Sequence, residues 1–250
     1  MSLQAGDYSY MGVGKVYIRR RALAEAMLPI GNAPKLSFGV TEDVKEQRDY
    51  TVVGGGTVAE VRRISAVECS ITLADLDKGN LTRAFFGTGS SIASATIANE
   101  SHLAHKGGFI PLNFPPDETE TFTVASGATT YVRDSDYEVS SGGITILEDG
   151  DIDDATLLEI DYTSRDHDSV QAITAAAYEY ELFFEGLNEA KSGRPVNVHA
   201  YRIKLGATQI LDLINEDFAT FEVKGKLLRD NSKKGAGVSK YFKIQVVTGE

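Results

Sequence analysis

Apolar and polar residues alternate with a period of two along much of the chain. The alternation is clearest in five segments, residues 36–40, 67–73, 178–184, 221–227 and 242–246. Successive side chains of a β-strand point to opposite faces, so each segment predicts a strand with one buried face and one polar face. Strands of this kind are typical of antiparallel sheets, and the chain is therefore predicted to be mainly β.

One predicted helix interrupts the strands. Asp75 or Asp77 offers an N-cap, Gly87 offers a C-terminal stop, and the apolar side between them carries Leu81, Ala84 and Phe85. Two shorter helices are predicted over residues 22–27 and 208–215. The helical content is therefore expected to be small.

The strand predicted over residues 196–205 changes phase in its middle. The apolar residues of its first half are Val196, Val198 and Ala200, and those of its second half are Tyr201, Ile203 and Leu205. This switch predicts either a β-bulge near Ala200 and Tyr201 or a strand that is covered on both faces.

Acidic residues are concentrated in one central segment. Residues 94–170 hold 16 acidic and 3 basic side chains, a net charge of −13, whereas the remainder holds 20 acidic and 22 basic side chains, a net charge of +2. The central segment also contains short alternating stretches joined by glycine-rich turns. We therefore predict a discontinuous β core of residues 1–95 and 167–250, interrupted by an acidic β-module of residues 96–166.

Composition excludes several classes of protein. A net charge of −11 argues against a protein that grips nucleic acid through its phosphates. No run of 18 apolar residues predicts a transmembrane helix, and the first 14 residues lack the apolar segment of a secretion signal. The single cysteine, Cys69, rules out an internal disulfide framework and fits a cytosolic folding compartment.

One aspartate-rich motif and one pair of histidines resemble metal sites, but each lacks necessary ligands. Residues 149–154 start like a calcium loop, but the sixth position is Asp154 where glycine is needed and the twelfth is Ile160 where glutamate is needed. His102 and His105 have no further ligands at zinc spacing. We interpret these segments as an acidic turn and polar loops, and expect neither a metal nor a cofactor.

The remaining reactive side chains also favour a structural interpretation. Cys69 alternates with apolar residues, as a buried small hydrophobe would. The run Arg19-Arg20-Arg21 ends a predicted strand and is expected to be a solvated charge cluster. Because no nucleophile, base and orienting group are found together, we expect no catalysis. The enzyme alternative, a glycan hydrolase with two distant carboxylates, lacks a Trp for sugar stacking.

Four stretches in a fixed order carry a resemblance to a known family. They are GVGKVYIRRR with LPIGNAPKLSFGVTEDVKEQRDYT, then SITLADLDKGNLTRAFFG, then ELFFEGLNEAKSGRPVNVHAYRIKLGA, and finally LINEDFATFEVKGKLLRD with SKYFKIQVV. Together they span most of residues 12–93 and 175–247. In order and spacing they resemble the major tail tube proteins of long, non-contractile-tailed bacteriophages. The acidic segment looks like the extra β-module that some of these proteins carry.

The resemblance implies a fold and an assembly. The fold is a β-sandwich or barrel-like core flanked by one α-helix, with a small inserted β-module on the exterior of the tube. Copies of the chain close into hexameric rings, and the rings stack into the tail tube through which the genome is delivered. The implied partners are other copies of the chain and tail proteins such as the tape measure, terminator and distal tail proteins. DNA passes through the lumen without specific binding, and the protein assembles in the host cytoplasm and resides in the virion tail.

Two groups of residues are candidates for this assembly. The segment Thr41–Thr57 is rich in charge and glycine, and we predict a polar loop that orders on a neighbouring subunit. Its candidate self-assembly residues are Glu42, Asp43, Lys45, Arg48, Asp49, Tyr50, Gly54, Gly55 and Gly56. The candidate lumen-facing strand residues are Glu179, Glu181, Glu222 and Lys224.

Three other functions remain open from the sequence. The chain could be the inner tube of a contractile injection machine or a tail terminator, which share the ring architecture. It could also be a binding module whose acidic insert recognises a basic partner or a cell surface. Long tubes, single rings and unassembled protein would distinguish these functions.

Overall fold

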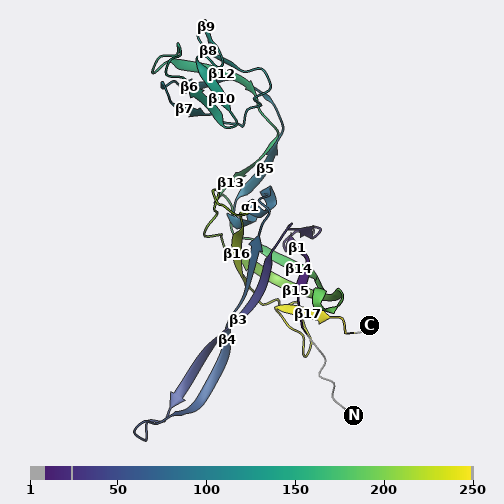
Figure 1. The fold of residues 1–250 in the computed structure, drawn as a ribbon. Helices are drawn as coiled ribbons and strands as arrows, with labels where there is room; N and C mark the ends of the chain where they lie inside the picture. The colour runs from purple at the N-terminus through teal and green to yellow at the C-terminus, as the bar shows by residue number, and fades with distance from the viewer. Residues whose placement is uncertain (1–8, 24, 249–250) are drawn as a thin grey trace. The chain divides into compact units, whose positions relative to one another are not determined.

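The computed structural model describes residues 9–23 and 25–248, and the chain is mainly β, as predicted (Figure 1). It divides into two compact units, which we call the core unit, residues 1–89 and 170–250, and the inserted unit, residues 90–169. The predicted acidic module, residues 96–166, falls within the inserted unit. Strands β5 (Thr88–Ile92) and β13 (His167–Gln171) pair with each other where the chain passes between the units.

The core unit is built on one antiparallel sheet. Its strands are β1 (Gly12–Arg20), β2 (Leu28–Pro29), β3 (Lys35–Arg48), β4 (Thr57–Leu73), β14 (Glu179–Asn188), β15 (Arg194–Leu205), β16 (Phe221–Leu227) and β17 (Phe242–Val246). Their order is β2-β1-β14-β15-β16-β4-β3, and β17 pairs with β15 outside this path. Residues 196–200 of β15 pair with β17, whereas residues 203–205 pair with β16. The side of β15 opposite β14 therefore pairs with two different strands in succession.

A single hydrophobic cluster lies inside this sheet. Strands β1 and β4 are separated by three strands, yet both contribute buried side chains to the same cluster. The sheet must therefore curve around its core in a sandwich-like arrangement. Leu182, Ala200 and Ile203 at the centre are fully buried.

The predicted helix is confirmed as α1 (Lys78–Ala84). The side chain of Asp77 caps it by accepting a hydrogen bond of 3.0 Å from the Asn80 N–H. Its end differs in detail from the prediction, because the left-handed residue is Phe86 (φ 49°) and not a glycine. The Gly87 N–H then donates to the Thr82 carbonyl and closes the final turn.

The two shorter predicted helices are wrong. Residues 208–215 form irregular structure, and the described residues of 22–27 contain no helix. In the first case, tertiary contacts replace the helical hydrogen bonds. The Thr208 N–H donates to the Ala84 carbonyl at the end of α1, and the Thr208 hydroxyl donates to the Glu222 carbonyl at 2.6 Å.

The predicted bulge in β15 is confirmed. Tyr180 pairs with Ile203 and Leu182 pairs with Ala200, so β15 has one extra residue between these two pairs. Both Ala200 and Tyr201 are buried, which explains the change of apolar phase. A short 3-10 turn, η1 (Glu189–Lys191), precedes the strand.

The inserted unit is a small sandwich with its own core. One sheet has the order β6-β12-β8-β9 and consists of β6 (Thr96–Leu103), β12 (Leu157–Thr163), β8 (Thr123–Ser126) and β9 (Thr129–Tyr131). The other has the order β10-β11-β7 and consists of β10 (Tyr137–Ser140), β11 (Gly143–Ile146) and β7 (Phe109–Pro111). Ile144, Leu158 and Ile160 are fully buried in a second hydrophobic cluster. This unit buries its apolar side chains without those of the core unit.

Candidate assembly surfaces

The segment predicted as a polar loop is instead a long β-hairpin. Strand β3 continues to Arg48 and β4 begins at Thr57, so only residues 49–56 form a loop. We call residues 42–64 the arm and residues 49–56 its tip (Figure 1). The prediction of an unpaired loop is wrong because residues 57–64, across the hairpin, supply the hydrogen-bonding partners that residues 42–48 need.

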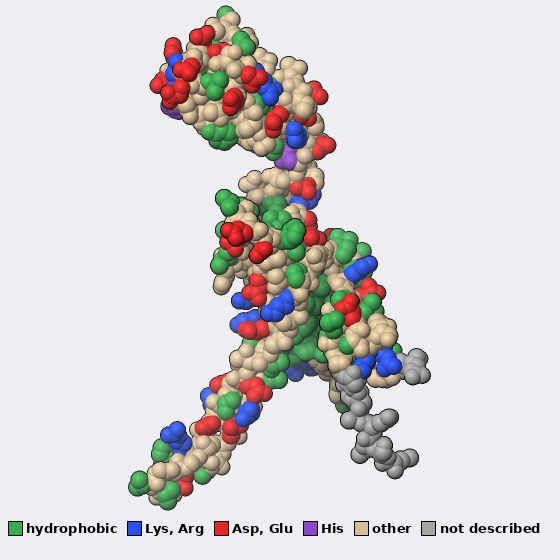
Figure 2. Space-filling model, viewed as in Figure 1, with side chains coloured by type: hydrophobic (Ala, Val, Ile, Leu, Met, Phe, Trp, Pro, Cys, Tyr) green, Lys and Arg blue, Asp and Glu red, His purple; other side chains and the backbone are tan. Residues whose placement is uncertain are grey.

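The strands of the arm are exposed on both faces. Beyond the bulge at Ser65, they pair only with each other, and every residue of 42–48 and 57–64 is exposed. Acidic and basic side chains are interspersed along the arm (Figure 2). Arg62 makes ion pairs with Glu42 at 3.5 Å and with Glu60. The exposed apolar side chains among these charges are Val44, Val58, Val61 and Ile64.

The tip is an ordered turn with an apolar surface. The Asp49 carboxylate accepts hydrogen bonds from the N–H and hydroxyl of Thr51, and these bonds lower the pKa of Asp49. Gly54 adopts φ 77°, and a side chain at Gly55 would collide with the Asp49 carbonyl. The apolar side chains Tyr50, Val52 and Val53 remain largely exposed.

The predicted self-assembly residues therefore lie on two parts of one hairpin. Four of them are on β3, namely Glu42, Asp43, Lys45 and Arg48. The other five are in the tip, namely Asp49, Tyr50, Gly54, Gly55 and Gly56. The sequence interpretation missed Val52 and Val53, although three large apolar residues between a charged strand and three glycines are an unusual pattern for a solvated turn.

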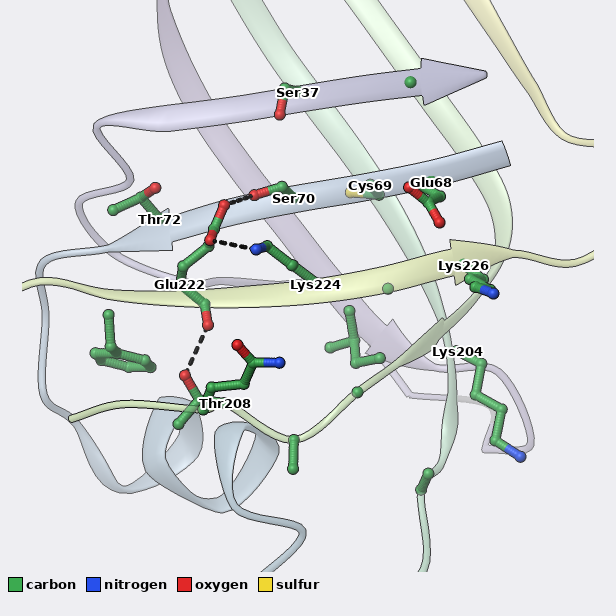
Figure 3. A pocket seen from close by; sticks show the side chains of 18 of the residues that line it. Ser37, Glu68, Cys69, Ser70, Thr72, Lys204, Thr208, Glu222, Lys224 and Lys226 are labelled. Atoms are coloured by element: carbon green, nitrogen blue, oxygen red, sulfur yellow. Dashed lines mark hydrogen bonds and ion pairs between the residues drawn. The ribbon is translucent and has the colours of Figure 1, made fainter. Parts of the chain in front are cut away.

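A groove of about 1030 Å³ lies on the polar face of β3, β4 and β16 (Figure 3). Its floor includes Ser37, Ser70 and Glu222, and residues 205–210 and 212 contribute to its border. The Gly206 N–H donates to the Lys224 carbonyl and the Thr208 hydroxyl to the Glu222 carbonyl, so this segment lies beside β16. The carboxylate of Glu222 accepts a hydrogen bond from Ser70 and lies 3.1 Å from the Lys224 ammonium, and both contacts lower the pKa of Glu222. The lining of the groove therefore combines apolar and charged side chains.

The four candidate lumen residues all lie on the face of the sheet away from the core, and each has a partner within the chain. Glu179 accepts two hydrogen bonds from Arg202, at 2.7 and 2.8 Å, and these hold its pKa below the ordinary value. Glu222 pairs with Lys224. These residues therefore add little net charge to the surface that they occupy.

Glu181 is less accessible than the sequence interpretation assumed. Its side chain is 15% exposed and accepts hydrogen bonds from Arg19 Nε at 2.8 Å and from His199 Nε2 at 2.6 Å. Burial raises the pKa of Glu181, but the hydrogen bonds from Arg19 and His199 outweigh burial, and the pKa lies below its ordinary value. Most of the Glu181 carboxylate is therefore covered by its own partners.

The arginine run is not a solvated cluster. Arg19 pairs with Glu181 at 2.6 Å, Arg20 stacks 3.8 Å above the Tyr178 ring, and Arg21 pairs with Asp230 at 3.0 Å. Hydrogen bonding from Arg21 is the main reason why the pKa of Asp230 lies far below its ordinary value. The run fastens two segments, the start of β14 and the residues around Asp230, to the end of β1.

The two segments that resemble metal sites make hydrogen bonds and ion pairs with neighbouring residues. Lys106 donates from its N–H to Asp154 at 2.8 Å, and its ammonium lies 3.8 Å from Asp153. His102 bonds Glu100 at 2.8 Å. Among the described residues, no group of three or more His, Cys, Asp or Glu side chains is arranged to hold a metal. Cys69 is buried, as predicted, and burial raises the pKa of its thiol to about 12.

No motif in the sequence predicted the buried polar network of the inserted unit. Glu100 accepts hydrogen bonds from the Tyr162 hydroxyl at 2.7 Å, the Asn113 N–H at 2.9 Å and His102. Burial raises the pKa of Glu100, but these hydrogen bonds lower it by more than burial raises it. The pKa therefore lies below its ordinary value. The buried Asp136 also serves two backbone N–H groups, those of Val132 and Asp151.

Comparison with known proteins places almost the whole chain in one family. A family model described as "Protein of unknown function UCP028589" matches residues 9–245. No curated protein matches the chain. Within the described residues, no helix has the length and apolar character needed to cross a bilayer.

Proposed function

The chain belongs to this family, and we propose that it is a structural virion protein whose copies form hexameric rings that stack into a phage tail tube. The tube is the conduit for genome delivery. The number of subunits and the tube itself come from the resemblance to tail tube proteins. What the structure contributes is support for association between copies.

The arm is the observation that carries the proposal. A two-stranded hairpin that packs against nothing is marginally stable in water, and this one also exposes four β-branched apolar side chains in its strands. Both features are explained if the arm lies against other copies of the chain. The energetic gain is burial of apolar surface, at roughly 25 cal/mol per Å².

The outer edge of β3 supports the same proposal. This 14-residue strand has only β4 as a neighbour in the described part of the chain, so its other edge presents unpaired N–H and C=O groups. Long exposed edges favour pairing with further strands. In a closed ring, each edge can be completed by the next subunit without leaving a free end.

The lumen residues fit passive passage of DNA. Glu179, Glu181, Glu222 and Lys224 are neutralised by partners in the same chain. A wall of paired charges releases few counterions on meeting phosphate, so it holds DNA only weakly. The proposal requires no catalysis and no cofactor, and the tape measure, terminator and distal tail proteins would meet the ends of the tube.

An arm truncation tests the proposal. Residues 44–62 are replaced by Asn-Gly, which joins the cross-strand partners Asp43 and Arg63 through a tight turn. We expect a folded monomer that forms no tubes in negative-stain micrographs at concentrations where the wild-type protein does. As a matched control, residues 94–166 are replaced by Asn-Gly, and tubes should persist.

Tubes of normal length from the armless variant would contradict the proposal. Single rings that never lengthen in the wild-type protein would favour the tail terminator. If removal of residues 94–166 abolishes host adsorption but not tube formation, the inserted unit has a binding role.

A further inference from the structure

The tip of the arm and the groove on the sheet are complementary in chemistry. We propose that Tyr50, Val52 and Val53 in the tip of one copy dock in the groove that residues 205–212 of a second copy border. This inference rests on the proposed function and names the two surfaces that meet. It makes the contact head to tail, because the tip and the groove are different parts of the chain.

The tip has three apolar side chains and nothing within its own arm to cover them. Val53 is fully exposed and Tyr50 is 87% exposed. The hydrogen bonds of Asp49 hold the turn in one conformation. A preorganised apolar turn loses little conformational entropy on binding.

The groove has the size and lining to receive this turn. Its volume of about 1030 Å³ is at the upper end of the range for small-molecule pockets, which is enough for three side chains. Phe86, Leu205, Ile210 and Phe221 contribute to its lining. Ile210, on the segment that borders the groove, is 67% exposed. Burying it would add to the apolar gain.

A copy cannot fill its own groove. Gly39 of β3 lines the groove, and the same strand runs on, paired with β4, to Arg48 beside the tip. At about 3.3 Å per residue, the paired strand keeps Arg48 roughly 30 Å from Gly39. A tip that docks in the groove must therefore come from another chain.

Charge favours an approach in which the bases of the arm face residues 212–217. Among the described residues, the exposed bases of the arm without an ion pair are Lys45, Arg48 and Arg63. The segment that borders the groove and continues beyond it carries exposed acids without an ion pair to any described residue, namely Asp212, Glu216 and Asp217. Asp212 lines the groove, and Arg48 directly precedes the tip. Because the groove is also lined by Lys204, Lys224 and Lys226, opposite charges meet only in the register that places Arg48 beside Asp212.

A pair of complementary variants tests the contact. Val53→Asp damages the tip, and Ile210→Asp damages the groove. Both residues are exposed, so each variant should fold like the wild-type protein by circular dichroism. Val132→Asp, at a position 61% exposed in the inserted unit, is the matched control. Sedimentation velocity and negative-stain microscopy measure the assemblies.

We expect each damaged variant alone to lose rings and tubes, while Val132→Asp retains them. An equimolar mixture of the two should form heterodimers and nothing larger, because only the intact tip of one variant and the intact groove of the other remain. Tubes from either variant at the wild-type threshold concentration would overturn this contact and leave the proposed function standing. Wild-type protein that stays monomeric at every concentration would overturn both.

Discussion

The two units differ in how many of their polar and apolar groups find partners within the unit. The inserted unit closes on itself, since two small sheets enclose its hydrophobic cluster and Glu100 and Asp136 are satisfied by donors within the unit. The core unit has a larger cluster but also presents a bare hairpin, a free strand edge and an apolar groove. The inserted unit thus meets its bonding needs internally, whereas a free strand edge and exposed apolar side chains favour association with further chains.

Substitutions that open a matched cavity in each hydrophobic cluster should produce the largest changes in unfolding free energy. Ile160→Ala in the inserted unit and Leu182→Ala in the core unit each remove a fully buried side chain. Each should lower the unfolding free energy of its own unit by about 2–5 kcal/mol. Urea unfolding followed by circular dichroism and tyrosine fluorescence should show two transitions, of which each substitution moves only one. A single transition moved by both would remove the distinction between the units.

The buried carboxylate of the inserted unit predicts a smaller effect that depends on pH. Because the pKa of Glu100 is lowered by folding, its contribution to stability is present above its unfolded pKa of roughly 4.3 and is lost as pH falls through the lower folded value. Glu100→Gln should cost about 1–3 kcal/mol at pH 7. Urea titrations should show this difference shrinking below about pH 4. Glu159→Gln, on the exposed face of β12, is the control and should change little. A difference that grows at low pH would contradict this assignment.

Charge reversal on the arm should give the smallest free-energy change, and it acts on assembly. Arg48→Asp should raise the threshold concentration for tube formation, by less than about fivefold per contact because exposed ion pairs contribute at most about 1 kcal/mol. Adding Asp212→Arg in the same chain should restore the wild-type threshold, as light scattering can measure. If Asp212→Arg does not restore the threshold, Arg48 of the arm does not pair with Asp212 of the groove.

Residue pattern alone determined the β class and the burial of Cys69. It also narrowed the N-cap to Asp75 or Asp77, and the phase change in β15 to a bulge or a strand covered on both faces. These features depend on neighbours a few residues apart, whose periodicity reports directly on one local conformation. The arm was different, because Glu42, Asp43 and the other charges of β3 occupy both faces and leave no apolar alternation to detect. Its strand conformation comes from hydrogen bonds to residues 57–64.

The tertiary structure decided everything that depends on residues far apart in the chain. Residues 208–215 have an apolar spacing that suits a helix, but hydrogen bonds from Thr208 to the carbonyls of Ala84 and Glu222 hold the segment beside α1 and β16. Arg19 finds Glu181 only because β1 and β14 are adjacent in the sheet. Sequence periodicity reports which side of a strand faces the core, but the partner across the sheet is chosen by chain topology and by the burial that folding makes available.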